Sequence, residues 1–214
     1  LGEIRAKNPR AISRELAHTY IAVLGALGDA ERLNLSLEIC VQNVFENTSK
    51  GTHHEALGFR VAMGHIFRKM GMRDVAEATL DGVYKDILQF GCSERTYLAM
   101  LLEAGRILLL QGRPARAYAA YLRPCLERAQ AKGYTRVAER ARRNAIACVE
   151  ELVNKNYSTE ELDVDLKGRG DFQPLQVANI DPRFSFDVAV VSEWFARLST
   201  ARSLEVELLN LESR

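Results

Sequence analysis

Four histidines and four cysteines are the side chains of this sequence that could bind a metal ion or act as nucleophiles. They are His18, His53, His54, His65, Cys40, Cys92, Cys125 and Cys148. No two cysteines form a CxxC pair, and the adjacent side chains of His53 and His54 diverge at the start of a helix, so the spacing of a zinc site is absent. The sequence also contains no GxxxxGKS/T, GxGxxG, GxSxG or HExxH motif. These observations predict a protein without a metal, a cofactor or a catalytic site.

Arginines form the strongest charge feature. Residues 106–143 carry 10 basic and 2 acidic side chains, although the net charge of the whole chain is only +1. Arg136, Arg140 and Arg143 are spaced by four and three, which places them on one face of a helix. Such a face can be solvated, can contact another part of the chain, or can bind an acidic protein or nucleic acid. Interleaved aromatic side chains are scarce, which favours an acidic partner at 113–143 over nucleic acid.

The chain also has an acidic segment that could contact the arginine face. Residues 160–171 contain Glu160, Glu161, Asp163, Asp165 and Asp171. Opposite charges attract most strongly where they are held close together. One hypothesis is therefore that this segment folds back along Arg136, Arg140 and Arg143.

The elements that position these residues belong to an internal repeat. Each copy contains a small residue, a large apolar residue, a glycine, an alanine and a second large residue. They are Gly64, Phe67, Gly71, Ala76 and Leu80 in one copy and Gly105, Leu108, Gly112, Ala117 and Tyr121 in the next. The offset is 41 residues at all five positions, and a looser copy with Gly28 lies 43 residues before Gly71. A fixed period of this length is typical of stacked helical hairpins.

The apolar residues within each copy recur at intervals of three and four, which predicts helices rather than strands. Gly71 and Gly112 separate the paired helices, where a helix end favours a residue that can adopt a left-handed conformation. Pro114 follows at a position where the first turn of a helix tolerates proline. Gly64 and Gly105 allow a neighbouring helix to approach closely. The pattern predicts seven helices over residues 11–154.

The motifs Gly64–Phe67–Gly71–Ala76 and Gly105–Leu108–Gly112–Ala117 resemble the tetratricopeptide repeat, over roughly residues 13–150. The period is 41–43 residues rather than the usual 34. Long-period relatives include kinesin light chains, MalT-type regulators and the fifth subunit of the anaphase-promoting complex. The resemblance implies an all-α fold, a right-handed superhelical array of antiparallel helical hairpins. It also implies a concave groove that binds a peptide or helix of another protein.

Three regions are expected along the chain. Residues 1–154 form the helical array, and residues 155–186, with Pro174 and Pro182, form an irregular connecting segment. Residues 187–214 resume a helical pattern and are expected to form a C-terminal capping helix, with Asp187 as its N-cap. The apolar stretches are too short to span a membrane, and no signal peptide opens the sequence. Cytoplasmic or nuclear localisation is therefore expected, without secretion.

The favoured function is a protein–protein interaction scaffold within a multiprotein assembly. One alternative is an effector-sensing regulatory domain of a larger protein, similar to MalT, and another is a nucleic-acid-binding helical array. The candidate partner-binding residues lie on the first helices of the hairpins and in the arginine row. They are Arg60, His65, Arg106, Arg136, Arg140 and Arg143.

Overall fold

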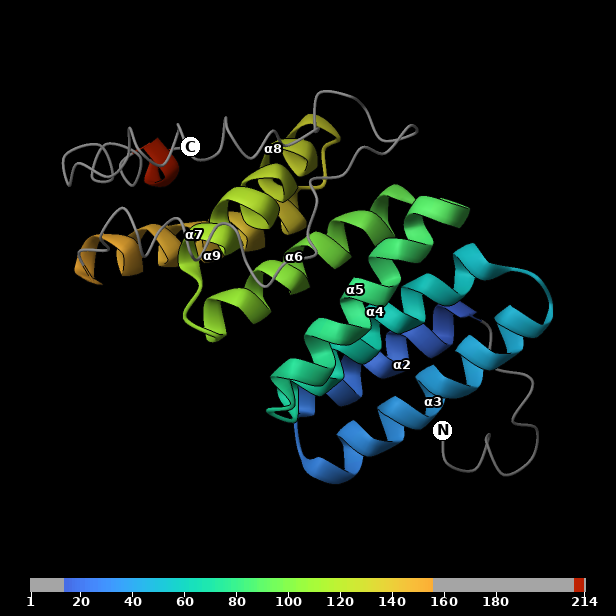
Figure 1. Cartoon of the computed structure of the whole chain (residues 1–214). Helices are drawn as coiled ribbons and strands as arrows, with labels where there is room; N and C mark the ends of the chain where they lie inside the picture. Colours follow the sequence, from blue (N-terminus) through green and yellow to red (C-terminus); the bar gives the residue numbers. More distant parts are fainter. Residues whose placement is uncertain (1–13, 156–209, 214) are drawn as a thin grey trace. The chain divides into compact units, whose positions relative to one another are not determined.

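The computed structural model describes residues 14–155 and 210–213, and every regular element in these ranges is helical. The prediction of an all-α protein is therefore confirmed for this part of the chain. The elements are α2 (Arg14–Leu27), α3 (Ala30–Ser49), α4 (His53–Lys69), α5 (Arg73–Phe90), α6 (Glu94–Leu110), α7 (Pro114–Arg116), the π-helical segment η1 (Ala117–Leu122), α8 (Arg123–Ala131) and α9 (Thr135–Lys155) (Figure 1). The chain divides into two compact units, Leu1–Asp86 and Ile87–Arg214. Each unit is described separately below.

Glycines end the helices where the repeat predicted them. The backbone of Gly71 has a φ angle of 80°, and that of Gly112 has a φ angle of 73°. Both angles lie in the left-handed region, which costs little energy only for glycine. After Gly112, Pro114 occupies the first turn of α7, as predicted. Equivalent glycines also end the second helix of each hairpin, a regularity that was not predicted from the sequence; they are Gly51, Gly91 and Gly133.

In the first unit, α3 contacts both α2 and α4, and α4 also contacts α2. The buried core of these three helices includes Ile21, Leu33, Cys40 and Ile66. Phe59 of α4 is fully buried and stacks on the ring of His18 of α2, with the ring centroids 4.2 Å apart. The third helix is therefore held by both helices of the preceding hairpin.

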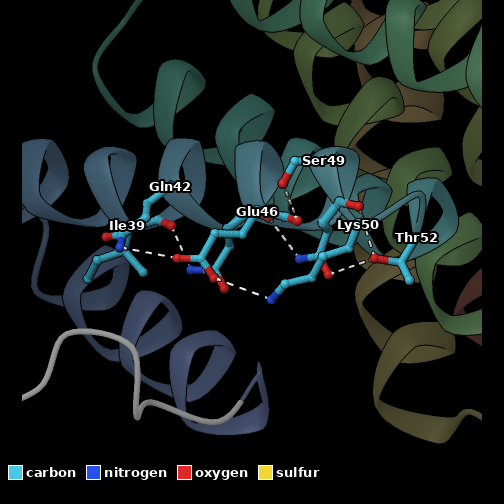
Figure 2. Close-up of polar contacts among 8 residues, drawn as sticks. Ile39, Gln42, Glu46, Ser49, Lys50 and Thr52 are labelled. Atoms are coloured by element: carbon cyan, nitrogen blue, oxygen red, sulfur yellow. Dashed lines mark hydrogen bonds and ion pairs between the residues drawn. The ribbon is translucent and has the colours of Figure 1, made fainter.

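Polar side chains fix the turn between α3 and α4 (Figure 2). Lys50 ends α3, and its amide N–H donates to the carbonyl of Glu46. The hydroxyl of Thr52 donates to the carbonyl of Asn47 at 3.0 Å. One turn earlier, the side-chain amide of Asn47 donates to the carbonyl of Asn43 at 2.8 Å. The bonds to Glu46 and Asn47 satisfy carbonyl groups that a helix end would otherwise leave to solvent.

In the second unit, α7, η1 and α8 follow one another without interruption, so residues 114–131 form the second helix of a hairpin with α6. The segment α9 contacts α8, η1, α7 and α6. The buried core includes Leu98, Met100, Tyr118, Leu122 and Val149. Here too the third helix contacts both helices of the preceding hairpin, the same relation as that of α4 to α2 and α3.

Two glycines bring paired helices close together. A Cβ atom placed on Gly64 of α4 would lie 2.8 Å from Cδ2 of Leu80 in α5. One placed on Gly105 of α6 would lie 2.6 Å from Cγ of Leu122 in η1. Cβ atoms essentially never lie this close to other heavy atoms, so both contacts need glycine. The close approach expected from the small residues is present at both positions.

The π-helical segment corrects one detail of the predicted register. The 41-residue offset matches Tyr121 to Leu80, but Leu122 is the residue that lies closest to Gly105, with Cβ of Tyr121 at the longer distance of 3.3 Å. The amide of Arg123 donates to the carbonyl of Tyr118, five residues back, so the wide turn adds one residue. Pro124 follows directly, and a proline cannot donate the hydrogen bond that a regular α-helix needs there. The register of the second hairpin therefore advances by one residue after Ala117.

Several expectations fall outside the described residues. These include almost all of the connecting segment 155–186, the fold-back of the acidic segment 160–171, and the capping helix 187–214 apart from residues 210–213. Residues 210–212 form a helical turn. Among the helices that are described, none combines the length and the apolar character needed to cross a membrane.

Candidate functional site

Arg60 lies on α4 and is half-buried. Its guanidinium forms an ion pair with the carboxylate of Asp86 on α5. Gly82 of α5 leaves room for this side chain, because a Cβ atom at that position would lie 2.7 Å from Nη2 of Arg60. Arg60 therefore connects α4 to α5, and its predicted role in partner binding stays a prediction.

His65 is also half-buried on α4. Nδ1 of its ring lies 3.0 Å from Nη2 of Arg68, one turn further along the helix. The ring also faces Gly25 of α2, where an added Cβ atom would meet it at 3.9 Å. His65 thus belongs to the contact between α2 and α4. Within the described residues, no group of three His, Cys, Asp or Glu side chains could hold a metal ion.

Arg106 lies in the second unit, on α6. Its Nη1 donates to Oε1 of Glu103 at 2.9 Å, and Glu103 is only 7% exposed. A carboxylate that is largely removed from water needs a partner of this kind. Arg106 therefore compensates a buried charge, and the structure gives it a role inside the hairpin. Its contribution to a binding surface stays a prediction.

Arg136, Arg140 and Arg143 all lie on α9 and are exposed. The structure brings these three predicted residues together along one side of the helix, as their spacing predicted. Arg143 is 3.9 Å from the carboxylate of Glu139, a weak pair between two exposed side chains. Within the described residues, no carboxylate lies within 4.0 Å of Arg136 or Arg140. The row is thus exposed, unlike Arg116 and Arg128 of the same basic region.

Three other arginines of the basic region, Arg106, Arg123 and Arg128, are paired with carboxylates inside the second unit. The side chain of Arg128 is 15% exposed and forms an ion pair with Glu94, in which Nη2 donates to Oε2 at 2.7 Å. The guanidinium carbon of Arg128 also lies 5.0 Å from the ring centroid of Tyr97. Its hydrogen bond keeps the pKa of Glu94 below the ordinary value. Arg123 pairs with Glu127 one turn later, at 2.9 Å.

The cluster of Glu94, Tyr97 and Arg128 was not identified from the sequence. Glu94 opens α6 directly after the N-cap Ser93, and Arg128 lies 34 residues away in α8. Neither residue belongs to a motif, and a pairing over this distance in sequence leaves no local pattern. The ion pair between Glu94 and Arg128 joins α6 to α8, the two helices of the hairpin.

Three of the four cysteines, Cys40, Cys92 and Cys125, do not have the chemistry of nucleophiles. Burial raises the pKa of Cys40 and that of Cys125 to about 12. Burial is also the main cause that raises the pKa of Cys92, to about 11. The reactive form of cysteine is the thiolate, so these groups are almost entirely protonated and inert near neutral pH. The thiol of Cys125 donates to the carbonyl of Leu98 at 3.5 Å, in keeping with a core residue.

Comparison with known protein families, with curated proteins and with solved structures finds no match to this chain. Its function is therefore inferred from the arrangement of the residues described above.

Proposed function

We propose that this chain is a protein–protein interaction scaffold, in which helical hairpins of the tetratricopeptide type hold a peptide or helix of a partner within a larger assembly. The observation that carries the proposal is the repeated contact of Gly64 with Leu80 and of Gly105 with Leu122. Each contact joins two helices of one hairpin, and the first helices of the two hairpins begin 41 residues apart, at His53 and Glu94. Repeated hairpins of this kind stack into elongated surfaces, and such surfaces serve mainly to bind other proteins.

The chemistry of the described residues supports binding rather than catalysis. Three thiols have raised pKa values. The side chains of Arg60, Arg106 and Arg128 pair with carboxylates of their own unit. A catalytic site needs acid–base or nucleophilic groups that converge where a substrate can reach them. Side chains that are paired within their own unit do not meet this requirement.

Affinity capture followed by reconstitution tests the scaffold. The intact chain is used as bait, and each captured protein is then purified and mixed with it. The expected result is at least one protein that co-elutes with the chain in gel filtration at fixed stoichiometry. A variant with Gly105→Leu, which forces α6 away from η1, should lose this complex.

A different outcome would favour an effector-sensing domain. In that case the chain would form no complex with purified proteins, and a small molecule from a metabolite panel would raise its melting temperature by mass action. That result would contradict the scaffold.

A further inference from the structure

The two faces of α9 have different roles. Its buried residues are Ala138, Ala141, Ala145, Cys148, Val149 and Leu152. Small side chains dominate the first half of this set, and they allow α9 to lie close against α8, η1 and α6. The position of α9 is therefore fixed by its inner face. Substitutions on the outer face leave the core of the second unit unchanged.

The outer face carries positive charge that the preceding hairpin does not neutralise. Arg136 and Arg140 are exposed, and Glu139 is the single acidic residue between Thr135 and Arg143. Its carboxylate lies beside Arg143, not beside the other two arginines. In contrast, Arg128 is fastened to Glu94 in the same unit. Arg136 and Arg140 therefore place two exposed positive charges one helical turn apart on this face.

We infer that the outer face of α9 is a docking surface for an acidic polypeptide segment, whose carboxylates pair with Arg136 and Arg140. This inference rests on the proposed scaffold function and specifies the chemistry of the partner. The spacing of four residues separates the Cα atoms of Arg136 and Arg140 by about 6 Å along the helix axis. Carboxylates two residues apart in an extended chain, or four apart in a helix, have a similar separation. The planar guanidinium donates two parallel hydrogen bonds to a carboxylate.

The same observations favour a polypeptide over nucleic acid. Proteins that bind DNA tightly make about 6–10 phosphate contacts. The row on α9 offers two arginines with no carboxylate nearby among the described residues, and a third that Glu139 partly neutralises. The same helix carries Glu150 and Glu151 further along, and these would repel a phosphate backbone. A short acidic segment can avoid these residues, whereas a continuous polyanion cannot do so easily.

Fluorescence anisotropy with defined probes tests the inference on the intact chain. The first probe is a fluorescein-labelled (Glu-Ala)6 peptide, the second is the neutral (Gln-Ala)6 peptide, and the third is a labelled 12-base single-stranded DNA. We expect the acidic peptide alone to bind, with an affinity that falls as the salt concentration rises. The double variant Arg136→Gln/Arg140→Gln should weaken this binding about fivefold, as the loss of two exposed ion pairs implies. Charge reversal to glutamate should weaken it further.

A matched control distinguishes binding through the arginines of α9 from a nonspecific effect of the net charge. Lys85 on α5 and Arg95 on α6 are exposed, so Lys85→Gln/Arg95→Gln removes two positive charges that lie outside α9. This variant should bind the acidic peptide within about twofold of the unsubstituted chain, because neither residue belongs to the row. Equal losses in both double variants would overturn the inference, as would equal binding of the neutral peptide or preferential binding of the DNA. Failure of the acidic peptide to bind the intact chain would overturn it as well.

The experiments distinguish a failure of this docking surface from a failure of the proposed scaffold function. If the bait captures its partner equally well with and without Arg136→Gln/Arg140→Gln, and the acidic peptide does not bind, the scaffold stands and this docking surface is wrong. If no protein forms a complex with the bait, the scaffold is wrong. All variants are first compared by urea denaturation, where exposed substitutions should leave the denaturation midpoint nearly unchanged.

Discussion

Replacement of Gly64 by alanine tests the close contact between α4 and α5. The added methyl group would lie 2.8 Å from Cδ2 of Leu80 and 2.9 Å from its Cγ. Leu80 is 3% exposed, and its Cγ is not the flexible end of the side chain, so the leucine must move within a packed core. Overpacking of this kind costs about 1–3 kcal/mol. Alanine in a helix interior recovers about 1 kcal/mol relative to glycine, so Gly64→Ala should be neutral to destabilising by about 2 kcal/mol.

Gly25 provides the matched control within the same unit. It lies inside α2, and an added Cβ atom would be 3.9 Å from the ring of His65, an ordinary van der Waals contact. Gly25→Ala therefore gains the helix propensity of alanine without a clash and should stabilise the unit by up to about 1 kcal/mol. Both substitutions replace glycine by alanine in a helix, so both gain the same helix propensity. The difference between them, about 1–3 kcal/mol, isolates the cost of the contact with Leu80.

Urea denaturation followed by circular dichroism measures the two free energies of unfolding. A double-mutant cycle with Leu80→Ala extends the test, because truncation of the leucine removes the atoms that Gly64→Ala would meet. Leu80→Ala should cost about 2–5 kcal/mol in the native background and clearly less in the Gly64→Ala background. If Gly64→Ala stabilises the chain as much as Gly25→Ala does, the close approach of α4 and α5 is refuted.

Three further predictions follow from single residues. Gly71→Ala places a Cβ atom in open space but at a φ angle of 80°, so backbone strain alone should cost about 1–2 kcal/mol in urea denaturation. The hydrogen bond from Arg128 lowers the pKa of Glu94 from 4.5, so this pair stabilises the fold above about pH 4.5 and loses that effect as the pH falls through the lower value; Glu94→Gln should show a smaller loss of stability on acidification. Since the pKa values of Cys40 and Cys125 are about 12, iodoacetamide at about pH 8 should label both thiols in guanidinium chloride at about 6 M but not in the native chain, as measured by mass spectrometry.

The helices and their ends could be predicted because local chemistry determines them. Gly71 and Gly112 recur at the same offset as the apolar residues around them, and both adopt the left-handed conformation that other residues avoid. Gly64 and Gly105 indicate close helix contacts for a similar reason, because a residue without a side chain leaves space for the neighbouring helix. Patterns of this kind depend on a few neighbouring residues, and they are visible in a single sequence.

The register within residues 114–131 could not be predicted in the same way. A fixed offset of 41 residues assumes regular α-helix throughout, whereas η1 contains one residue more per turn. Pro124 is visible in the sequence as a residue that interrupts regular helical hydrogen bonding, but proline can also kink a helix or begin one. Only the contact of Gly105 with Leu122, instead of Tyr121, shows which response the chain adopts.

The candidate site was predicted in part for a related reason. Helical spacing places Arg136 and Arg140 on one face, and the structure confirms that they lie together and exposed. The basic region as a whole was misleading, because a count of charges does not show which of them are paired. Arg128 contributes to that count, yet it is largely buried against Glu94, 34 residues earlier in the chain. Contacts between distant residues depend on the tertiary fold, which single-sequence patterns do not encode.

The spacing of the helix starts continues into α9, but one position of the repeat changes there. The helices α4, α6 and α9 begin at His53, Glu94 and Thr135, at a constant spacing of 41 residues. The position held by Gly64 and Gly105 is therefore held by Ile146 in α9. A branched side chain at this position cannot make the close contact that Gly64 makes with Leu80. Among the described helices, α9 therefore lacks the close-contact glycine that α4 and α6 share.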